Sequence, residues 1–134
     1  MEQRSRFSLG KWFQQSAYGL TPLMKWAKGD LTDKQINLED PAVKETVNIQ
    51  EEKYDRTALI FACRSIQPLS EIRRKVDILI GMGADLTLTA AEYHDDDLTI
   101  SGLYKAIDYI NRQKDDGTGN LEAIKQAVTP PVTE

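Results

Sequence analysis

The sequence of 134 residues is poor in the residue types that several classes of protein need. It contains one cysteine, Cys63, so it cannot form an internal disulfide. It also lacks any apolar run near the roughly 20 residues that a membrane-spanning helix requires. Residues 1–13 carry basic side chains with no apolar stretch behind them, which argues against a signal peptide. We therefore expect a cytoplasmic protein, or one delivered into the cytosol of a host cell.

The sequence also lacks an excess of positive charge. Its net charge is −4 and its pI is about 5.1, whereas proteins that bind the phosphate backbone need a basic footprint. We expect no binding to nucleic acid and none to membranes. A mildly acidic surface is typical of an ordinary soluble protein. It would also suit a partner protein with a basic surface, because opposite potentials speed the encounter of two proteins.

Residues with catalytic or metal-binding chemistry are equally scarce. The glycines of Gly81–Gly83 and Gly117–Gly119 do not follow a strand and open a helix as in nucleotide sites, so we interpret them as turn residues. His94 is the only histidine and precedes three aspartates, Asp95–Asp97. An alternative hypothesis is a metal-dependent enzyme that uses this loop, although adjacent aspartates point in different directions and the spacing of a calcium loop is absent. We expect no cofactor, no bound metal and no catalytic residue, with Cys63 as a small buried apolar side chain.

Three segments of the chain are similar to one another. Thr21–Ala27 aligns with Thr57–Cys63 and then with Ser101–Ile107. Each segment begins with a hydroxyl residue that can cap a helix N-terminus, and each has leucine two positions later. Small and apolar residues follow at the spacing of a buried helical face. We predict a helix in each segment, the third of which runs from Ser101 to Arg112.

A second helix is expected after each of these segments. Val76–Asp85 is the clearest, because it passes through Gly83, where the left-handed conformation past a helix end suits glycine. In the first unit the pair Asp40-Pro41 favours the start of a short helix. In the third unit Leu121–Val128 carries apolar residues on one face.

These segments resemble the ankyrin repeat family, whose period is near 33 residues and whose signature is Thr-Pro-Leu-His-x-Ala. Thr21-Pro22-Leu23 matches the opening of that signature, and the Gly-Ala-Asp ending of Val76–Asp85 is similar to the end of the family's second helix. Met24, Ile60 and Tyr104 stand where the family has histidine. Longer connections between the units are a further departure from the family pattern. The resemblance covers residues 18–128.

The resemblance implies an all-α fold, a short ankyrin-like helix-pair solenoid with N- and C-terminal capping helices. The capping helices would be Ser8–Ala17 and Leu121–Val128. The chain would then form one domain over residues 1–128, followed by a disordered tail over residues 129–134. Trp26 stands where the family has a small residue. We interpret it as a core residue beside a short second helix, rather than as an exposed binding anchor.

Ankyrin repeat proteins generally bind other proteins through a concave face and the adjacent loop tips. The resemblance therefore implies a non-catalytic protein–protein interaction module. It leaves open an inhibitor or immunity-type protein that occludes a partner's functional surface, an adaptor, and a secreted effector that engages a host protein. The predicted partner-binding residues are Tyr54, Arg56, Arg64, Ser65, Tyr93, His94, Asp95 and Asp108. Tyrosine and arginine lead this set because they are enriched at binding hot spots.

Overall fold

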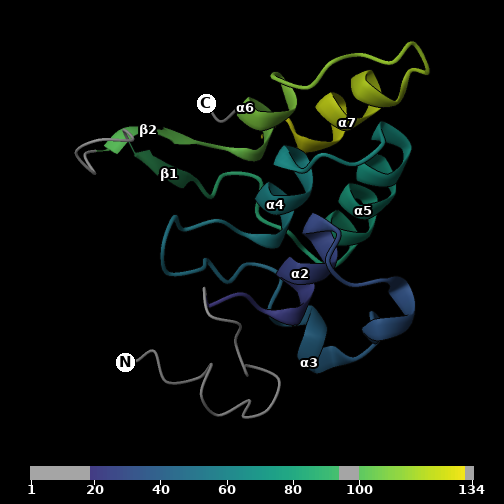
Figure 1. Cartoon of the computed structure of the whole chain (residues 1–134), viewed down its shortest axis with the longest axis vertical. Coiled ribbons are helices and arrows are strands. Elements are labelled where there is room, and N and C mark those ends of the chain that lie inside the picture. Colours follow the sequence, from purple (N-terminus) through teal and green to yellow (C-terminus); the bar gives the residue numbers. More distant parts are fainter. Residues whose placement is uncertain (1–18, 94–99, 132–134) are drawn as a thin grey trace.

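A computed structural model of the chain describes residues 19–93 and 100–131, which are mostly helical (Figure 1). One two-stranded antiparallel sheet accompanies the helices in these ranges. The elements are α2 (Pro22–Lys28), the short 3-10 helix η2 (Asp33–Gln35), α3 (Pro41–Lys44), α4 (Ala58–Arg64), α5 (Leu69–Gly81), β1 (Ala90–Tyr93), β2 (Ile100–Tyr104), α6 (Ala106–Ile110) and α7 (Asn120–Val128). No helix in the described ranges has the length and apolar character needed to cross a membrane.

The helices pack in two rows. In the first row α4 lies between α2 and α6, and in the second row α5 packs against α7 (Figure 1). The rows are joined because α4 contacts α5 and α6 contacts α7. As the central helix, α4 is covered on nearly every side, and all residues from Ala58 to Cys63 are buried. The core between the rows includes the fully buried side chains of Leu59, Ile72 and Ile124.

The predicted starts and ends of several helices are confirmed. The hydroxyls of Thr21 and Thr57 each accept the backbone N–H three residues along, over 3.1 and 3.2 Å, which caps α2 and α4. The carboxylate of Asp40 caps α3 by accepting a backbone N–H over 2.9 Å. Gly83 follows the end of α5 with a φ of 96°, the left-handed conformation that glycine adopts without a steric penalty.

The described residues are mostly helical, as predicted, but the third predicted helix is wrong over its first half, where a strand of a two-stranded sheet replaces it. Ser101 lies in β2, which pairs antiparallel with β1 and places Ala90 opposite Tyr104. Helix α6 begins only at Ala106, after Lys105 as its N-cap residue. The isoleucine, leucine and tyrosine of β2 suit a pleated strand better than a short helix once a pairing strand is available. Long-range pairing therefore overrides the capping signal at Ser101.

The interpretations of Trp26 and Cys63 as core residues are confirmed. Trp26 is 0% exposed, and its indole N–H donates to Asp33 in η2 over 2.8 Å. Its backbone carbonyl accepts from the buried Nζ of Lys75 over 2.7 Å, which ties the end of α2 to α5. Cys63 is also 0% exposed and its thiol is free. The predicted capping helix over Ser8–Ala17 lies outside the described residues.

Candidate functional site

The hairpin of β1 and β2 and the loop over residues 50–56 extend from the same side of the helices (Figure 1). The two segments are joined, because the backbone N–H of Ala91 donates to the carbonyl of Tyr54 over 2.8 Å. The side-chain amide of Gln50 also donates to the carbonyl of Thr89 over 3.0 Å. Strand β1 is therefore bonded to β2 on one edge and to the loop on the other. Together these segments form a rim beside α4 and α6.

A set of arginine and aromatic side chains lies along this rim and the adjacent helices. Arg56 stacks over Tyr54 at 4.2 Å from the ring centroid, and Arg112 lies 4.7 Å from the centroid of Tyr104. Arg64 and Arg112 both approach the ring of Tyr109, at 5.9 and 5.2 Å. These distances are those of cation–π contacts. We call this surface the Arg–Tyr face, and its residues are Tyr54, Arg56, Phe61, Arg64, Tyr104, Tyr109 and Arg112.

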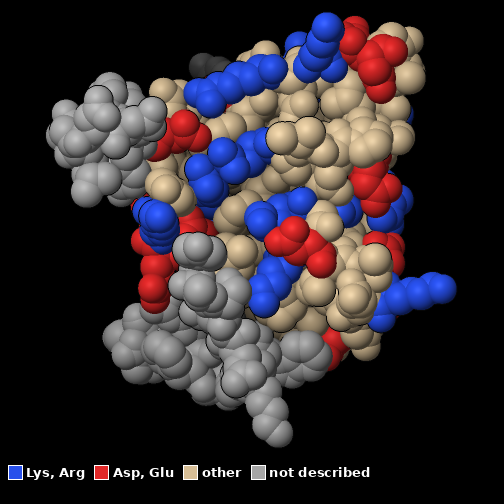
Figure 2. Space-filling view, viewed as in Figure 1, with Lys and Arg blue, Asp and Glu red and all other residues tan. Residues whose placement is uncertain are grey.

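The Arg–Tyr face is a local concentration of positive charge. Figure 2 shows basic side chains in a row across the first row of helices. Desolvation lowers the pKa of Arg64, and repulsion by Arg56 and Arg112 lowers it further, whereas Tyr109 and Glu92 act in the opposite sense. The Nε of Arg56 is buried and has no hydrogen-bond partner among the described residues. An anion placed here would weaken the repulsion among the arginines and could accept a hydrogen bond from the Nε of Arg56.

Tyr109 connects α6 to the hairpin. Its phenol O–H donates to Oε2 of Glu92 in β1 over 2.6 Å. Burial raises the pKa of Tyr109 to about 12, and the bond to Glu92 adds to the effect. The hydroxyl therefore stays protonated and acts as a donor at neutral pH. The carboxylate of Glu92 thus bonds α6 to strand β1 of the rim.

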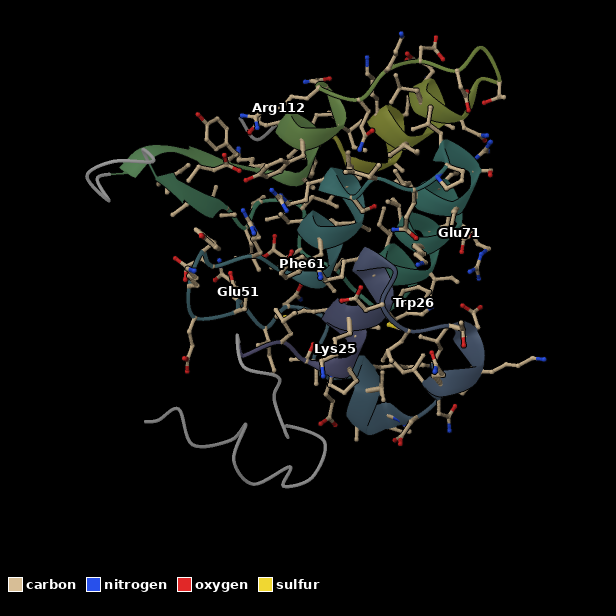
Figure 3. All side chains as sticks on the ribbon, viewed as in Figure 1. Lys25, Trp26, Glu51, Phe61, Glu71 and Arg112 are labelled. Atoms are coloured by element: carbon tan, nitrogen blue, oxygen red, sulfur yellow. The ribbon has the colours of Figure 1, made fainter. Side chains whose placement is uncertain are left out.

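A buried carboxylate sets the conformation of the loop that carries Tyr54 and Arg56. Glu51 is 3% exposed, and its two oxygens accept the backbone N–H groups of Lys53 and Tyr54 over 2.8 and 2.7 Å. A longer bond of 3.3 Å comes from the backbone of Arg56. Figure 3 shows Glu51, Phe61 and Arg112 on the side of the helices that carries the hairpin, and Glu71 on the other side. Glu51 thus positions the loop without facing the surface.

Two hollows flank α4 on the Arg–Tyr face. The first has a volume of about 330 Å³, and two arginines and a tyrosine line it. Its full set of lining residues is Arg64, Ser65, Ile66, Gln67, Glu92, Tyr109, Arg112 and Gln113. The second has a volume of about 270 Å³ and a similar mixture; it is lined by Leu20, Lys28, Glu51, Lys53, Tyr54, Arg56 and Phe61. Phe61 and Arg64 are one helical turn apart on α4, so the hollows are neighbours.

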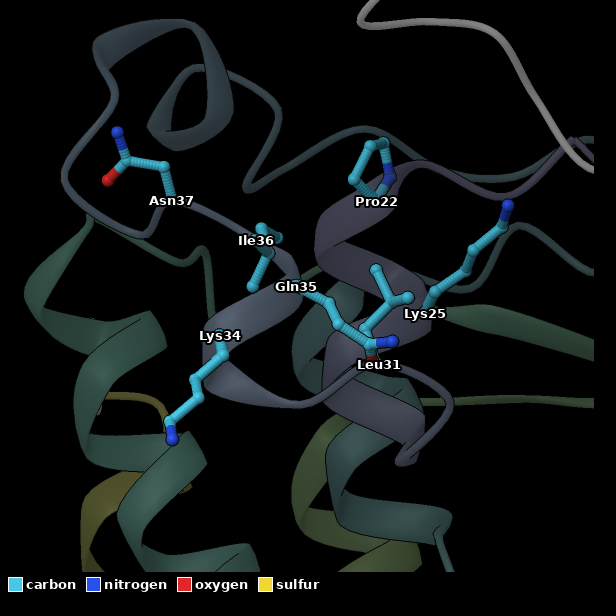
Figure 4. Close-up of a pocket in the computed structure, with 7 residues that line it drawn as sticks. All are labelled: Pro22, Lys25, Leu31, Lys34, Gln35, Ile36 and Asn37. Carbon is cyan, nitrogen blue, oxygen red and sulfur yellow. The ribbon is translucent and has the colours of Figure 1, made fainter.

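A third hollow lies away from this face, between α2 and the segment around η2 (Figure 4). It has a volume of about 480 Å³, and its lining residues are Pro22, Lys25, Leu31, Lys34, Gln35, Ile36 and Asn37. Its centre is aliphatic and its two lysines stand at the edges (Figure 4). Its described lining includes no carboxylate, histidine, cysteine or hydroxyl side chain.

The structure brings together three of the predicted partner-binding residues, Tyr54, Arg56 and Arg64. Ser65 lines the first hollow, but its hydroxyl already donates to a backbone carbonyl of α4 over 2.8 Å. The carboxylate of Asp108 caps α6 by accepting the backbone N–H of Lys105 over 2.8 Å. This capping bond gives Asp108 a structural role that the sequence analysis did not anticipate.

The remaining predicted residues are Tyr93, His94 and Asp95. Tyr93 ends β1, and its side chain is outside the description; His94 and Asp95 lie outside the described residues altogether. The hypothesis of a metal site in the His94 loop therefore stays a prediction. Within residues 19–93 and 100–131 no group of three or more potential metal ligands is found.

Sequence reasoning did not identify Glu92, Tyr104 or Arg112 as residues of this site. Their positions depend on where α6 begins. With the helix started at Ser101, Tyr104 falls inside it, whereas the true start at Ala106 puts Tyr104 on the hairpin and Tyr109 one turn into α6. The usable signal was Lys105 followed three residues later by Asp108, the spacing of a capping box.

We found no family model that matches the chain, and no significant match among curated proteins or solved structures. The site must therefore be interpreted from its own geometry. Guanidinium groups with aromatic support suit the recognition of anionic groups.

Proposed function

We propose that this protein is a non-catalytic protein-binding module that engages its partner through the Arg–Tyr face. The observation that carries the proposal is the surroundings of three guanidinium groups, those of Arg56, Arg64 and Arg112. They lie against aromatic rings, and none forms an ion pair with a described carboxylate. Arginine and tyrosine are the residues most enriched at binding hot spots. A surface that presents both, with no ion pair from these arginines to a described carboxylate, is suited to an external partner.

We further propose that the scaffold is a degenerate ankyrin-like solenoid of helix pairs. The two rows of helices, the threonine caps of α2 and α4, and the turn at Gly83 support this proposal. The third unit would begin at Lys105, and the hairpin would be an insertion ahead of it. In such a solenoid the first helices of the units line a common face, and these are α2, α4 and α6.

A single binding face is sufficient for an inhibitor or immunity-type protein that covers a partner's functional surface, and also for an effector. An adaptor needs a second surface, for which the hollow between α2 and η2 is the available candidate. We favour the single-face mode, because aromatic and cationic groups converge only at the Arg–Tyr face among the hollows of the described residues.

The test is quantitative co-purification from the cells that produce the protein. The tagged wild type is compared with the double variant Arg64→Glu/Arg112→Glu, and Arg73→Glu serves as a matched control. Arg64 and Arg112 are exposed, so their reversal leaves the core intact. Arg73 is equally exposed but lies on α5 in the other row, where it bonds Asn120.

A protein recovered with the wild type and the control, but lost with the double variant, would support the proposal. Circular dichroism and thermal melting must show that all three proteins are folded. If the recovered partner binds the double variant as strongly as the wild type, the Arg–Tyr face is not the binding surface. In that case the solenoid proposal survives, but the assignment of the site does not.

A further inference from the structure

We propose that the Arg–Tyr face recognises an acidic peptide segment of the partner protein that carries an apolar side chain beside its carboxylates. This inference rests on the proposed function, because it specifies the chemistry of the partner at the same site. It departs from the expectation of a basic partner, which came from the net charge of −4. The local charge of the face has the opposite sign.

The first step concerns the carboxylates near the face. Among the described residues, three carboxylates near the arginines already accept hydrogen bonds. Glu51 accepts the backbone N–H groups of its own loop, Glu92 accepts the phenol of Tyr109, and Asp108 caps α6. None of the three forms an ion pair with Arg56, Arg64 or Arg112 among the described residues, so the N–H groups of these arginines can donate to an external anion.

The second step concerns the orientation of the guanidinium groups. Arg64 and Arg112 both line the first hollow, and both approach the ring of Tyr109. A guanidinium that lies against a ring keeps its N–H groups available to a carboxylate, which can accept two of them at once. Gln113 cannot compete for such a ligand, since its amide donates to the carbonyls of Cys63 and Ser65.

The third step concerns Ile66, which also lines the first hollow. It is fully exposed, at 103% of the reference area, and lies in the short turn between α4 and α5. A single exposed isoleucine is ordinary on a protein surface. Here it stands at the edge of a hollow that also holds two arginines and a tyrosine, so a ligand in the hollow would cover it. An apolar side chain next to the carboxylates of the ligand would gain this contact.

The fourth step separates a peptide from a nucleic acid. Arginines and tyrosines can also hold single-stranded nucleic acid by stacking and phosphate contacts. Such binding follows a continuous basic track, whereas this face is short, and it belongs to a chain with a pI of about 5.1. An acidic peptide makes contact over a shorter length, which fits the two neighbouring hollows.

The test is selection from a displayed library of random short peptides against the wild-type protein, with the Arg64→Glu/Arg112→Glu and Arg73→Glu variants in parallel. We expect the enriched peptides to be rich in aspartate and glutamate with an apolar residue adjacent to them. Their affinity, measured by fluorescence anisotropy, should fall by about tenfold or more in the double variant, as expected for loss of paired charges. It should stay within about twofold in Arg73→Glu. Ile66→Ser should lower the affinity for a selected peptide that contains the apolar residue. The same change should have a smaller effect on the affinity for a version of that peptide in which alanine replaces the apolar residue.

The outcomes distinguish the two proposals. Enriched peptides that depend on Arg64 and Arg112 but show no acidic preference would overturn this inference and leave the proposed function standing. Peptides that bind the double variant unchanged, or no enrichment at all, would count against both. A labelled single-stranded oligonucleotide that displaces the selected peptides at equal concentration would also overturn the inference, in favour of nucleic acid binding at the face.

Discussion

Replacing Tyr109 by phenylalanine tests whether its hydroxyl holds the hairpin against α6. The O–H donates to Glu92 over 2.6 Å, and the residue is only 3% exposed. A hydrogen bond to a charged group contributes about 1.5–3 kcal/mol. Folded domains are stable by about 5–15 kcal/mol in total, so Tyr109→Phe should lose a measurable share of stability while the packing of its ring is preserved.

The pKa of Tyr109 adds a pH dependence to this prediction. Burial first, and then the bond to Glu92, raise this pKa from 10.0 to about 12 in the folded protein. The folded state thus holds the phenol proton more tightly than the unfolded chain. The resulting stability is fully present below about pH 10 and is lost as the pH rises towards 12. Burial is the larger cause of the shift, so the decline above pH 10 reports the buried setting of the phenol together with its bond to Glu92.

The assay is urea unfolding, followed by far-ultraviolet circular dichroism at neutral and at strongly alkaline pH. Tyr104→Phe is the matched control, because Tyr104 lies on the same face but its hydroxyl makes no hydrogen bond to a described residue. Tyr109→Phe should lower the free energy of unfolding at neutral pH and flatten its decline above pH 10. A loss no greater than that of Tyr104→Phe, or below about 0.5 kcal/mol, would refute the reasoning.

Three other predictions follow from buried or paired groups. Trp26→Ala should cost about 3–5 kcal/mol, because Trp26 is 0% exposed, and Trp26→Phe should cost less; equal losses in urea unfolding would contradict the packing argument. The side-chain bond to Arg74 lowers the pKa of Asp33 from 3.8 to about 2, so its stabilisation is present above pH 4 and lost between pH 4 and 2. Since Asp33 is about half exposed, the loss of stability amounts to no more than about 1 kcal/mol. In an acid titration of stability, Asp33→Asn should not show this loss between pH 4 and 2. Glu51→Ala should speed amide hydrogen exchange at Lys53 and Tyr54, whereas Glu51→Gln should do so less; unchanged exchange in both variants would rule out its positioning role.

Features decided by a few adjacent residues could be predicted from the sequence. Thr21, Thr57 and Asp40 cap helices through side chains that reach their own backbone within two or three residues. Gly83 takes a positive φ for a similarly local reason. Helix starts and ends at these positions depend little on the rest of the chain, which is why these predictions are confirmed.

The hairpin could not be predicted in the same way, because it depends on pairing between distant segments. Ser101 has the local chemistry of a helix cap, but Ala90–Tyr93 supplies a strand for it to join. This error also displaced the candidate site. Arg56 and Arg64 lie before the hairpin and were predicted, whereas Arg112 lies after it and was not placed on the face. Glu51 was missed because nothing in a glutamate next to another glutamate indicates that it will turn inward.

The bond from Ala91 to the carbonyl of Tyr54 makes the rim a single cooperative unit, although its parts are far apart in the sequence. The amide hydrogen of Ala91 cannot exchange with solvent unless strand β1 separates from the loop over residues 50–56. Its exchange rate therefore reports the free energy of opening the rim, with no substitution needed. A partner that bridges the loop and the hairpin would slow this one hydrogen more than a partner that touches either segment alone.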